Sequence, residues 1–301
     1  MPTTALHSSL CFSAHKPSSS SSSEDQSGFL LISSKPKSLL YKHPLWSPTH
    51  ANISLQFKEK ILCLEIMGVD SGKALSQNPS LHTASLHSIQ EIVTFLESKG
   101  IHQKDLGRIF GMCPKVLTSD IKSELNPVFN FLSYELKVPD QNFRKVINKC
   151  PRLLISSVQN QLKPALFYLQ RLGFNDIYAL AYQDPILLVS SVEKTLIPKL
   201  NFLQSLGFSK EDAVGMVLRC PSLFTFSIEN NFKPKFDYFA KEMNGSLDEL
   251  KEFPQYFAFS LEKRIKPRHI EIVLRGIKVA LPLMLKTTDE EFAELIRQGC
   301  G

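Results

Sequence analysis

The chain lacks the short sequence motifs that most catalytic and nucleotide-binding sites require. Its 301 residues contain no H-E-x-x-H, no G-x-S-x-G and no G-x-G-x-x-G. Residues 68–73 read G-x-x-x-G-K, one residue shorter than a phosphate-binding loop, and the following Ala74 lacks the hydroxyl that would hold magnesium. We therefore expect neither enzymatic activity nor a bound cofactor.

Metal-binding and membrane-spanning patterns are missing as well. None of the six cysteines belongs to a C-x-x-C pair, which a zinc site would need. Cys113, Cys150 and Cys220 each stand directly before a proline, and we interpret them as small buried apolar residues. Charge-free apolar runs such as residues 279–285 are far shorter than the roughly 18 residues of a membrane span, so we expect no membrane contact.

The first 50 residues lack arginine and contain only two acidic residues, Glu24 and Asp25, but fourteen serines. Such a segment has too little apolar surface to form a core. A serine-rich, acid-poor N-terminus is typical of an organelle transit peptide, and the absence of arginine before Arg108 favours a chloroplast over a mitochondrion. We interpret residues 1–50 as a disordered transit peptide; the alternative is a tail without a targeting function.

Pairs of prolines thirteen residues apart occur five times, and successive pairs start 37, 34, 36 and 33 residues apart. A fixed interval inside a period of this size indicates one supersecondary unit repeated along the chain, with length changes confined to the loops. The pairs are Pro114 and Pro127, Pro151 and Pro164, Pro185 and Pro198, Pro221 and Pro234, and Pro254 and Pro267.

The residues around these prolines predict two helices per unit. In the third unit Val192, Leu196, Leu200, Leu203 and Leu206 form one apolar helical stripe. The second proline falls inside this long helix and should bend it or reset its start. A Leu-Gly-Phe sequence then ends the helix through a left-handed glycine, and a shorter helix runs to the next proline. The expected N-caps of the long helices are Asp120, Ser157, Ser191, Ser227 and Ser260.

This pattern resembles the mitochondrial transcription termination factor (mTERF) family, whose helical repeats carry a proline followed by leucines. The blocks DPILLVSSVEKTLIPKLNFLQSLGFSKEDAV and CPSLFTFSIENNFKPKFDYF are close to the family consensus, and the resemblance covers roughly residues 89–297. It implies an all-α fold, a helical-repeat solenoid of about five to six units, each with two helices and a short proline-initiated turn. The family resemblance further implies a right-handed or left-handed superhelix whose concave basic surface binds nucleic acid in an organelle.

We divide the chain into three parts on these grounds. Residues 1–50 are the transit peptide. Residues 51–88 form an N-terminal extension, with a possible helix from Ile53 to Met67 and a Ser-, Gly- and Asn-bearing linker up to Pro79. Residues 89–301 are the repeat domain, whose first, partial unit lacks the long-helix proline and is expected to cap the solenoid.

Basic residues cluster around the prolines and are the candidates for phosphate contacts. Lys149 and Arg219 share the position two before the first proline of a unit, while Lys199, Lys235 and Arg268 share the position after the second. Equivalent positions lie along one edge of a solenoid, so a recurring cation could follow a phosphate backbone. The alternative is that a cation in a last helical turn stabilises the helix without any ligand. The full candidate set is Arg144, Lys145, Lys149, Arg152, Lys199, Arg219, Lys235, Arg264, Lys266 and Arg268.

Two classes of function fit the sequence. The first is a nucleic-acid-binding regulator of organelle gene expression, most simply a chloroplast transcription termination factor that binds double-stranded DNA and blocks or positions the plastid RNA polymerase. RNA binding for plastid intron splicing or transcript maturation is the alternative within this class. The second class is a protein-binding helical scaffold, and in each case we expect a monomer. The net charge of +6 permits a basic face without locating it.

Overall fold

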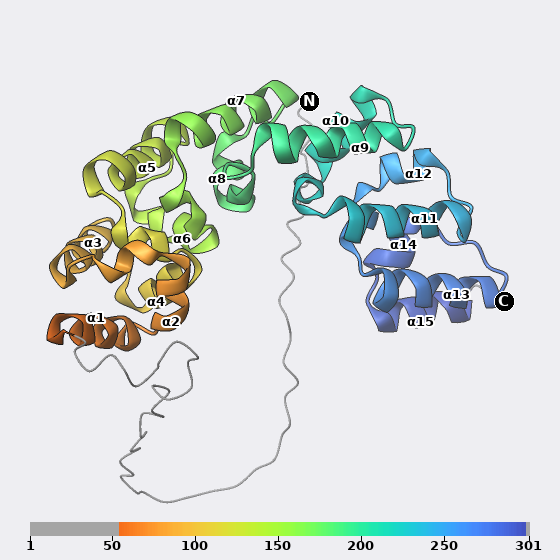
Figure 1. Ribbon diagram of the computed structural model, residues 1–301. Coiled ribbons are helices and arrows are strands. Elements are labelled where there is room, and N and C mark those ends of the chain that lie inside the picture. Colours follow the sequence, from red (N-terminus) through yellow and green to blue (C-terminus); the bar gives the residue numbers. More distant parts are fainter. Residues whose placement is uncertain (1–53, 299–301) are drawn as a thin grey trace, which may run out of the picture. The chain divides into compact units, whose positions relative to one another are not determined.

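The computed structural model describes residues 54–298, so the predicted transit peptide lies outside the described residues. The described residues belong to one compact unit and contain fifteen α-helices and no strand (Figure 1). The helices are α1 Leu55–Ile66, α2 Ser71–Gln77, α3 Leu86–Ser98, α4 Gln103–Met112, α5 Asn126–Asn130, α6 Phe143–Lys149, α7 Lys163–Leu172, α8 Ile177–Gln183, α9 Ile197–Ser205, α10 Lys210–Arg219, α11 Lys233–Lys241, α12 Leu247–Glu252, α13 Lys266–Leu274, α14 Leu281–Lys286 and α15 Asp289–Gln298.

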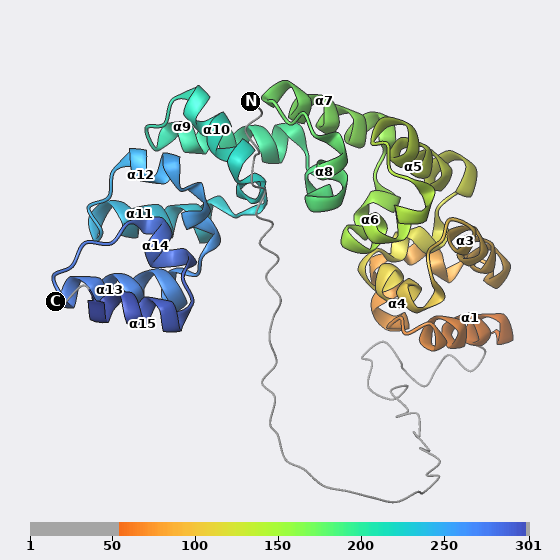
Figure 2. The same ribbon diagram turned by 180° about the vertical axis from the view of Figure 1, so that it is seen from behind.

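The helices are arranged as a solenoid of two layers, which confirms the predicted all-α fold class. Figure 1 shows α5 and α7 in one row and α6 and α8 in a second row, and the reverse view in Figure 2 separates the same rows. Successive short helices contact each other, as α6 does α8 and α10 does α12. The core lies between the layers, where Leu196, Leu200 and Leu203 of the predicted stripe are buried.

Each long helix starts at the predicted N-cap. The side chains of Asp120, Ser157, Ser191, Ser227 and Ser260 all accept a hydrogen bond from the backbone N–H three residues later. This contact satisfies one of the donors that a first helical turn leaves free.

The proline inside each long helix is accommodated by a π-turn. In the third unit the N–H of Leu196 donates to the carbonyl of Ser191, five residues earlier, at 3.1 Å. The wider turn relieves the clash that a proline ring makes with the carbonyl four residues before it. An α-helix then restarts with Pro198 in its first turn, where no N–H is needed. The five π-turns that precede these prolines are Ile121–Leu125, Val158–Leu162, Val192–Leu196, Ile228–Phe232 and Leu261–Ile265, and a sixth, Phe131–Glu135, follows α5.

The first proline of each unit begins a short 3₁₀ turn that carries the chain from one unit to the next. Long helices α7 and α9 end as predicted, with Gly173 and Gly207 at φ values of +107° and +105°. The short helix α12 begins with the complete capping box of Ser246 and Glu249. The 3₁₀ turns that begin with a proline are Pro79–His82, Pro114–Thr118, Pro151–Ile155, Pro185–Leu187, Pro221–Thr225 and Pro254–Ala258, and a further one lies at Asp140–Asn142.

The stretch before Pro79, for which the sequence predicted a linker, is instead part of the helical stack. Asp70 caps α2, and Ala74 and Leu81 are buried. The side-chain amide of Asn78 donates to the carbonyl of Pro114 and to the hydroxyl of Thr118, both at 2.9 Å. Serine, glycine and asparagine suggested a flexible segment, but here they cap and pack a short helix.

Pro79 in fact opens one further unit. It stands 35 residues before Pro114, has Leu81 two positions on, and Ser85 six positions on caps α3. Helix α3 is therefore the long helix of a unit that lacks the second proline. The helices α1 and α2 precede it, so the stack extends beyond the predicted boundary at residue 89.

Two glycines of α4 test whether this N-terminal segment packs on the repeats. A Cβ built at Gly107 would overlap the carbonyl oxygen of Met67, just after α1, whereas a Cβ at Gly111 meets no atom within 4 Å. We expect Gly111→Ala to stabilise the protein by up to about 1 kcal/mol, because alanine favours a helix over glycine. Gly107→Ala should instead destabilise it by about 1–3 kcal/mol through overpacking. Urea unfolding of both variants measures the difference; equal effects would contradict the packing of α1 on α4.

Candidate nucleic-acid interface

The cations that follow the long-helix proline point into the protein. The side chains of Lys235 and Arg268 are only 7% and 5% exposed. The ammonium of Lys235 donates to the carbonyl of Phe257 at 2.6 Å, and the ammonium of Lys199 donates to the carbonyl of Phe224. Both acceptors belong to the 3₁₀ turn of the next unit.

Arg268 has the same role at the end of the stack. Its guanidinium donates to the carbonyls of Met284 at 2.6 Å and Thr287 at 2.9 Å, and it pairs with Asp289 at 2.5 Å. Because these three cations donate to backbone carbonyls of the next element, Lys199, Lys235 and Arg268 are poorly placed for the predicted phosphate contacts. In these three units the repeated position therefore links one part of the stack to the next.

Burial changes the acid–base behaviour of this column. It lowers the pKa of Lys235 to about 8 and also lowers the pKa of Lys199. One further member, Lys60 of α1, was not predicted from the sequence; it is buried and donates to the carbonyls of Leu81 at 2.5 Å and Ala84 at 2.8 Å. A signal was present, because Lys60 stands 19 residues before Pro79, the interval that separates Lys235 from Pro254.

The second cation column bridges neighbouring short helices. The ammonium of Lys149 donates to the carbonyl of Tyr182 in the last turn of α8 at 2.9 Å, and Arg219 donates to the carbonyl of Lys251 in α12. Arg108 makes the equivalent contact with Asn148 in α6. A cation at the C-terminal end of a helix satisfies free carbonyls and the helix dipole. These side chains nevertheless remain exposed.

Three further candidates are held by partners. Arg144 pairs with Asp105 at 2.6 Å, and this hydrogen bond lowers the pKa of the Asp105 carboxyl. The ammonium of Lys266 lies 2.5 Å from a carboxylate oxygen of Glu262. The guanidinium of Arg264 donates to the carbonyl of Leu285 at 2.9 Å.

Exposed cations gather on α4 and α6 and the turns that follow them. Residues 103–118 and 143–155 contain seven basic residues and one acidic residue, whereas the corresponding segments 210–225 and 247–258 contain three basic and five acidic residues. The positive charge of the short-helix layer is therefore concentrated in its N-terminal half. Arg108 of α4 is exposed as well, but its guanidinium donates to the Asn148 carbonyl. We call the other five exposed cations of this region the α4/α6 patch: Lys104, Lys115, Lys145, Lys149 and Arg152.

Arg152 and Lys145 are the most available of the original candidates. Arg152 is exposed, and its guanidinium makes no hydrogen bond or ion pair with another residue of 54–298. The ammonium of Lys145 lies 5.4 Å from the ring centroid of Tyr182. Lys145 and Lys149 lie four residues apart on the exposed side of α6, and Arg152 lies in the 3₁₀ turn that follows, so the three can contact separate anionic groups.

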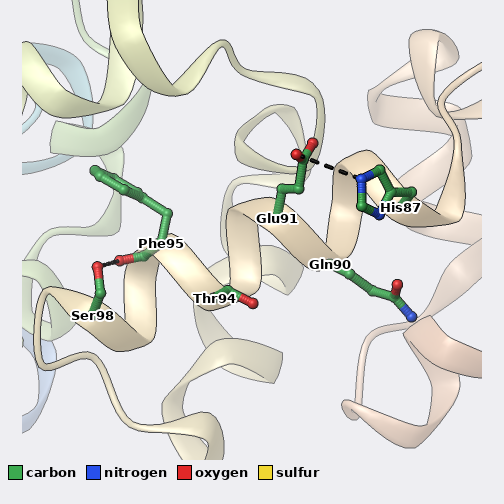
Figure 3. Close-up of a pocket in the computed structure, with 6 residues that line it drawn as sticks. All are labelled: His87, Gln90, Glu91, Thr94, Phe95 and Ser98. Atoms are coloured by element: carbon green, nitrogen blue, oxygen red, sulfur yellow. Dashed lines mark hydrogen bonds and ion pairs between the residues drawn. The ribbon is translucent and has the colours of Figure 1, made fainter.

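Hollows elsewhere on the surface bring no reactive groups together. The hollow in Figure 3 is lined by residues of α3 alone: His87, Gln90, Glu91, Thr94, Phe95 and Ser98. Within it the imidazole of His87 lies 3.6 Å from a Glu91 carboxylate oxygen. Within residues 54–298 no group of three His, Cys, Asp or Glu side chains could hold a metal ion.

The cysteines and the helix lengths agree with this description. Cys113, Cys150 and Cys220 are buried and free, and burial raises the pKa of each thiol. They therefore act as small apolar residues between units, as predicted. In the described part of the chain, no helix combines the length and apolar character that crossing a bilayer demands.

The buried ammonium of Lys235 predicts a pH-dependent stability. Because its pKa in the folded protein, about 8, lies below the ordinary value of about 10.4, the folded state loses this proton at lower pH than the unfolded state. The cost of burying the charge is therefore largest below pH 8 and disappears as the pH rises toward 10.4. We expect the stability of the parent protein, relative to Lys235→Met, to increase between pH 7.5 and 10.

Denaturant unfolding at both pH values measures this change. Lys210→Met is the matched control, because Lys210 is exposed in the first turn of α10. A constant free-energy difference between the parent and Lys235→Met at the two pH values would contradict the burial of a titrating ammonium.

Comparison with known proteins identifies the family. The sequence profile described as mTERF matches residues 33–180 and 175–293. The chain is 40% identical over 79 residues to the transcription termination factor MTERF4, chloroplastic, of Arabidopsis thaliana. This alignment covers 26% of this chain and 14% of that protein. The chain is 38% identical over 88 residues to MTERF5, chloroplastic, of the same plant, covering 29% and 18%.

A rice relative gives a similar result. The transcription termination factor MTERF4, chloroplastic, of Oryza sativa subsp. japonica is 35% identical over 82 residues, covering 27% of this chain and 16% of that protein. These alignments thus span less than a fifth of the length of each relative. The family profile, in contrast, extends over most of the chain and over the proline-based repeats described above, and the protein belongs to the mTERF family.

Proposed function

We propose that this protein is a nucleic-acid-binding regulator of chloroplast gene expression and that it acts as a transcription termination factor on double-stranded DNA. The observation that carries the proposal is the α4/α6 patch, an exposed group of cations on the short-helix layer of an mTERF-family solenoid. The relatives in Arabidopsis and rice are named as chloroplastic transcription termination factors. Bound duplex DNA would place the protein in the path of the plastid transcription machinery.

Phosphate contacts supply the affinity in this mechanism. Lys145 and Lys149 of α6 and Arg152 of the turn after it are spaced so that each can neutralise a separate phosphate. Lys149 uses one of its three ammonium hydrogens for the Tyr182 carbonyl and keeps two for a ligand. Such contacts position a duplex without reading its sequence. We expect the protein to bind DNA as a monomer.

RNA binding in plastid intron splicing or transcript maturation is the second candidate function. The observation in its favour is an aromatic side chain beside the patch: Tyr178 of α8 is 49% exposed. Exposed aromatic rings among cations are typical of proteins that bind single strands.

The salt dependence of binding tests the phosphate contacts. Replacing Lys145, Lys149 and Arg152 together by alanine should lower the slope of log affinity against log salt on duplex DNA by up to about three units, because each lost phosphate contact releases one counterion fewer. Fluorescence anisotropy at several salt concentrations gives the slope.

The control replaces three exposed lysines outside the patch, Lys58, Lys73 and Lys210, and should leave the slope unchanged. Tighter binding to duplex DNA than to single-stranded RNA of the same sequence is expected for a termination factor, and the reverse order for the RNA-processing alternative. A folded protein that binds neither at low salt would overturn both candidates and favour a protein-binding scaffold.

Import provides an independent test of the chloroplast assignment. Residues 1–50 fused to a fluorescent protein should enter chloroplasts, because the segment is serine-rich and free of arginine. Microscopy of leaf cells that express the fusion measures its location. Fluorescence confined to mitochondria or to the cytosol would contradict the assignment and leave the repeat domain unaffected.

A further inference from the structure

Two tyrosines of α8 and two lysines of α6 form one continuous surface. The rings of Tyr178 and Tyr182 are 4.4 Å apart between centroids, and the Tyr178 side chain is 49% exposed. The ammonium of Lys145 lies 5.4 Å from the centre of the Tyr182 ring, and the ammonium of Lys149 donates to the Tyr182 carbonyl. An exposed aromatic ring thus packs against a second ring, and two cations contact the residue that carries this second ring.

The tyrosine pair is specific to this unit. The position of Tyr178, seven before the proline, holds glycine, arginine, valine and leucine in the other four proline-pair units. The position of Tyr182, three before the proline, holds glycine, asparagine, leucine and lysine. The repeat fold therefore does not require an aromatic ring at either place. The core does not require the exposed half of Tyr178 either, because the buried face of α8 consists of Leu180 and Ala181.

We propose that this surface binds an unpaired nucleotide, with its base stacked on Tyr178 and its phosphates on Lys145 and Lys149. This inference rests on the proposed nucleic-acid binding and adds that the bound nucleotide is unpaired. A base inside a duplex is stacked on both faces by its neighbours, so only an unpaired base can offer a free face to the ring. Stacking of this kind is largely independent of sequence, since every base has an aromatic face.

The geometry suits this ligand in two respects. Tyr182 supports the ring of Tyr178 and limits its motion, so little rotamer freedom remains to be lost on binding. The cations stand on the neighbouring helix and not on α8, whose seven residues carry no charge. The base and its phosphates can therefore contact different helices at the same time. RNA and single-stranded DNA both supply the required chemistry.

Anisotropy titrations of the full chain with labelled oligouridylate, oligothymidylate and a mixed-sequence DNA duplex test the proposal. We expect Tyr178→Ala to lose roughly 5- to 150-fold in affinity for the single strands, the range for one stacked base. Tyr178→Phe, which keeps the ring, should bind like the parent. Affinity for the duplex should not change, and comparison of the two oligonucleotides shows whether RNA or DNA is preferred.

Two further variants control for structure. Tyr134→Ala removes a 71% exposed tyrosine that belongs to the long-helix layer, and it should have no effect. Tyr178→Leu keeps apolar bulk and helix propensity without a planar ring, and it should weaken binding as alanine does even if alanine lowers stability. Thermal unfolding by circular dichroism verifies that each variant is folded.

The outcomes separate this inference from the proposed function. Unchanged single-strand affinity in folded Tyr178→Ala or Tyr178→Leu would overturn the stacking site. A parent protein that binds the duplex but neither oligonucleotide would also overturn it, while nucleic-acid binding would stand. A parent that binds none of the three ligands at low salt would remove the proposed function and the inference together.

Discussion

The stack of units depends on hydrogen bonds that cross from one unit to the carbonyls of the next. A 3₁₀ turn after each proline leaves carbonyl groups inside the protein, and buried carbonyls must find donors. Long side chains from the preceding helical segments supply donors at five places: Lys60 to Leu81, Gln161 to Val189 just after a turn, Lys199 to Phe224, Lys235 to Phe257, and Arg268 to Met284 of α14. Four of these five donors are cations, which form stronger hydrogen bonds than neutral groups. The lowered pKa of Lys235 shows that desolvation of the charge offsets part of this gain.

The local features of the fold were predictable from sequence, while the direction of the long cations was not. N-caps, left-handed glycines and helix breaks at prolines depend on a few consecutive residues, and all appear where the pattern predicts them. Lys149 and Lys235 both occupy repeat positions beside prolines that other units also fill with a cation, yet Lys149 is exposed and Lys235 is buried. A lysine stem reaches about 6 Å, so its end is placed by a carbonyl some twenty or thirty residues away. The sequence therefore indicated which positions carry charge, but not whether a phosphate or a backbone carbonyl meets it.

The third proline-pair unit departs from this scheme on the short-helix side. Cations from α4, α6 and α10 each donate to a carbonyl near the end of the following short helix. In α8, however, the position two residues before the proline holds Gln183, where α6 has Lys149 and α10 has Arg219. No hydrogen bond from Gln183 to α10 occurs within residues 54–298. The next residue, Asp184, replaces the buried cysteine, and burial raises the pKa of its carboxyl. The polar link between the third and fourth proline-pair units is thus the hydrogen bond from Lys199 of α9 to the carbonyl of Phe224. The short helices α8 and α10 themselves are not joined by a cation within residues 54–298.

These internal uses of charge determine how a nucleic acid can be bound. A buried cation that donates to a buried carbonyl is poorly placed to neutralise a phosphate, because moving it to the surface would leave that carbonyl unpaired at a cost of about 1–3 kcal/mol. The net charge of +6 therefore overstates the charge that is available to a ligand. What remains is concentrated on α4 and α6, and the acidic residues of α10 and α12 disfavour an anion there. Tyr178 stands at the border between these regions, directly after the basic helices, where a strand held by its phosphates on α6 would present its next base.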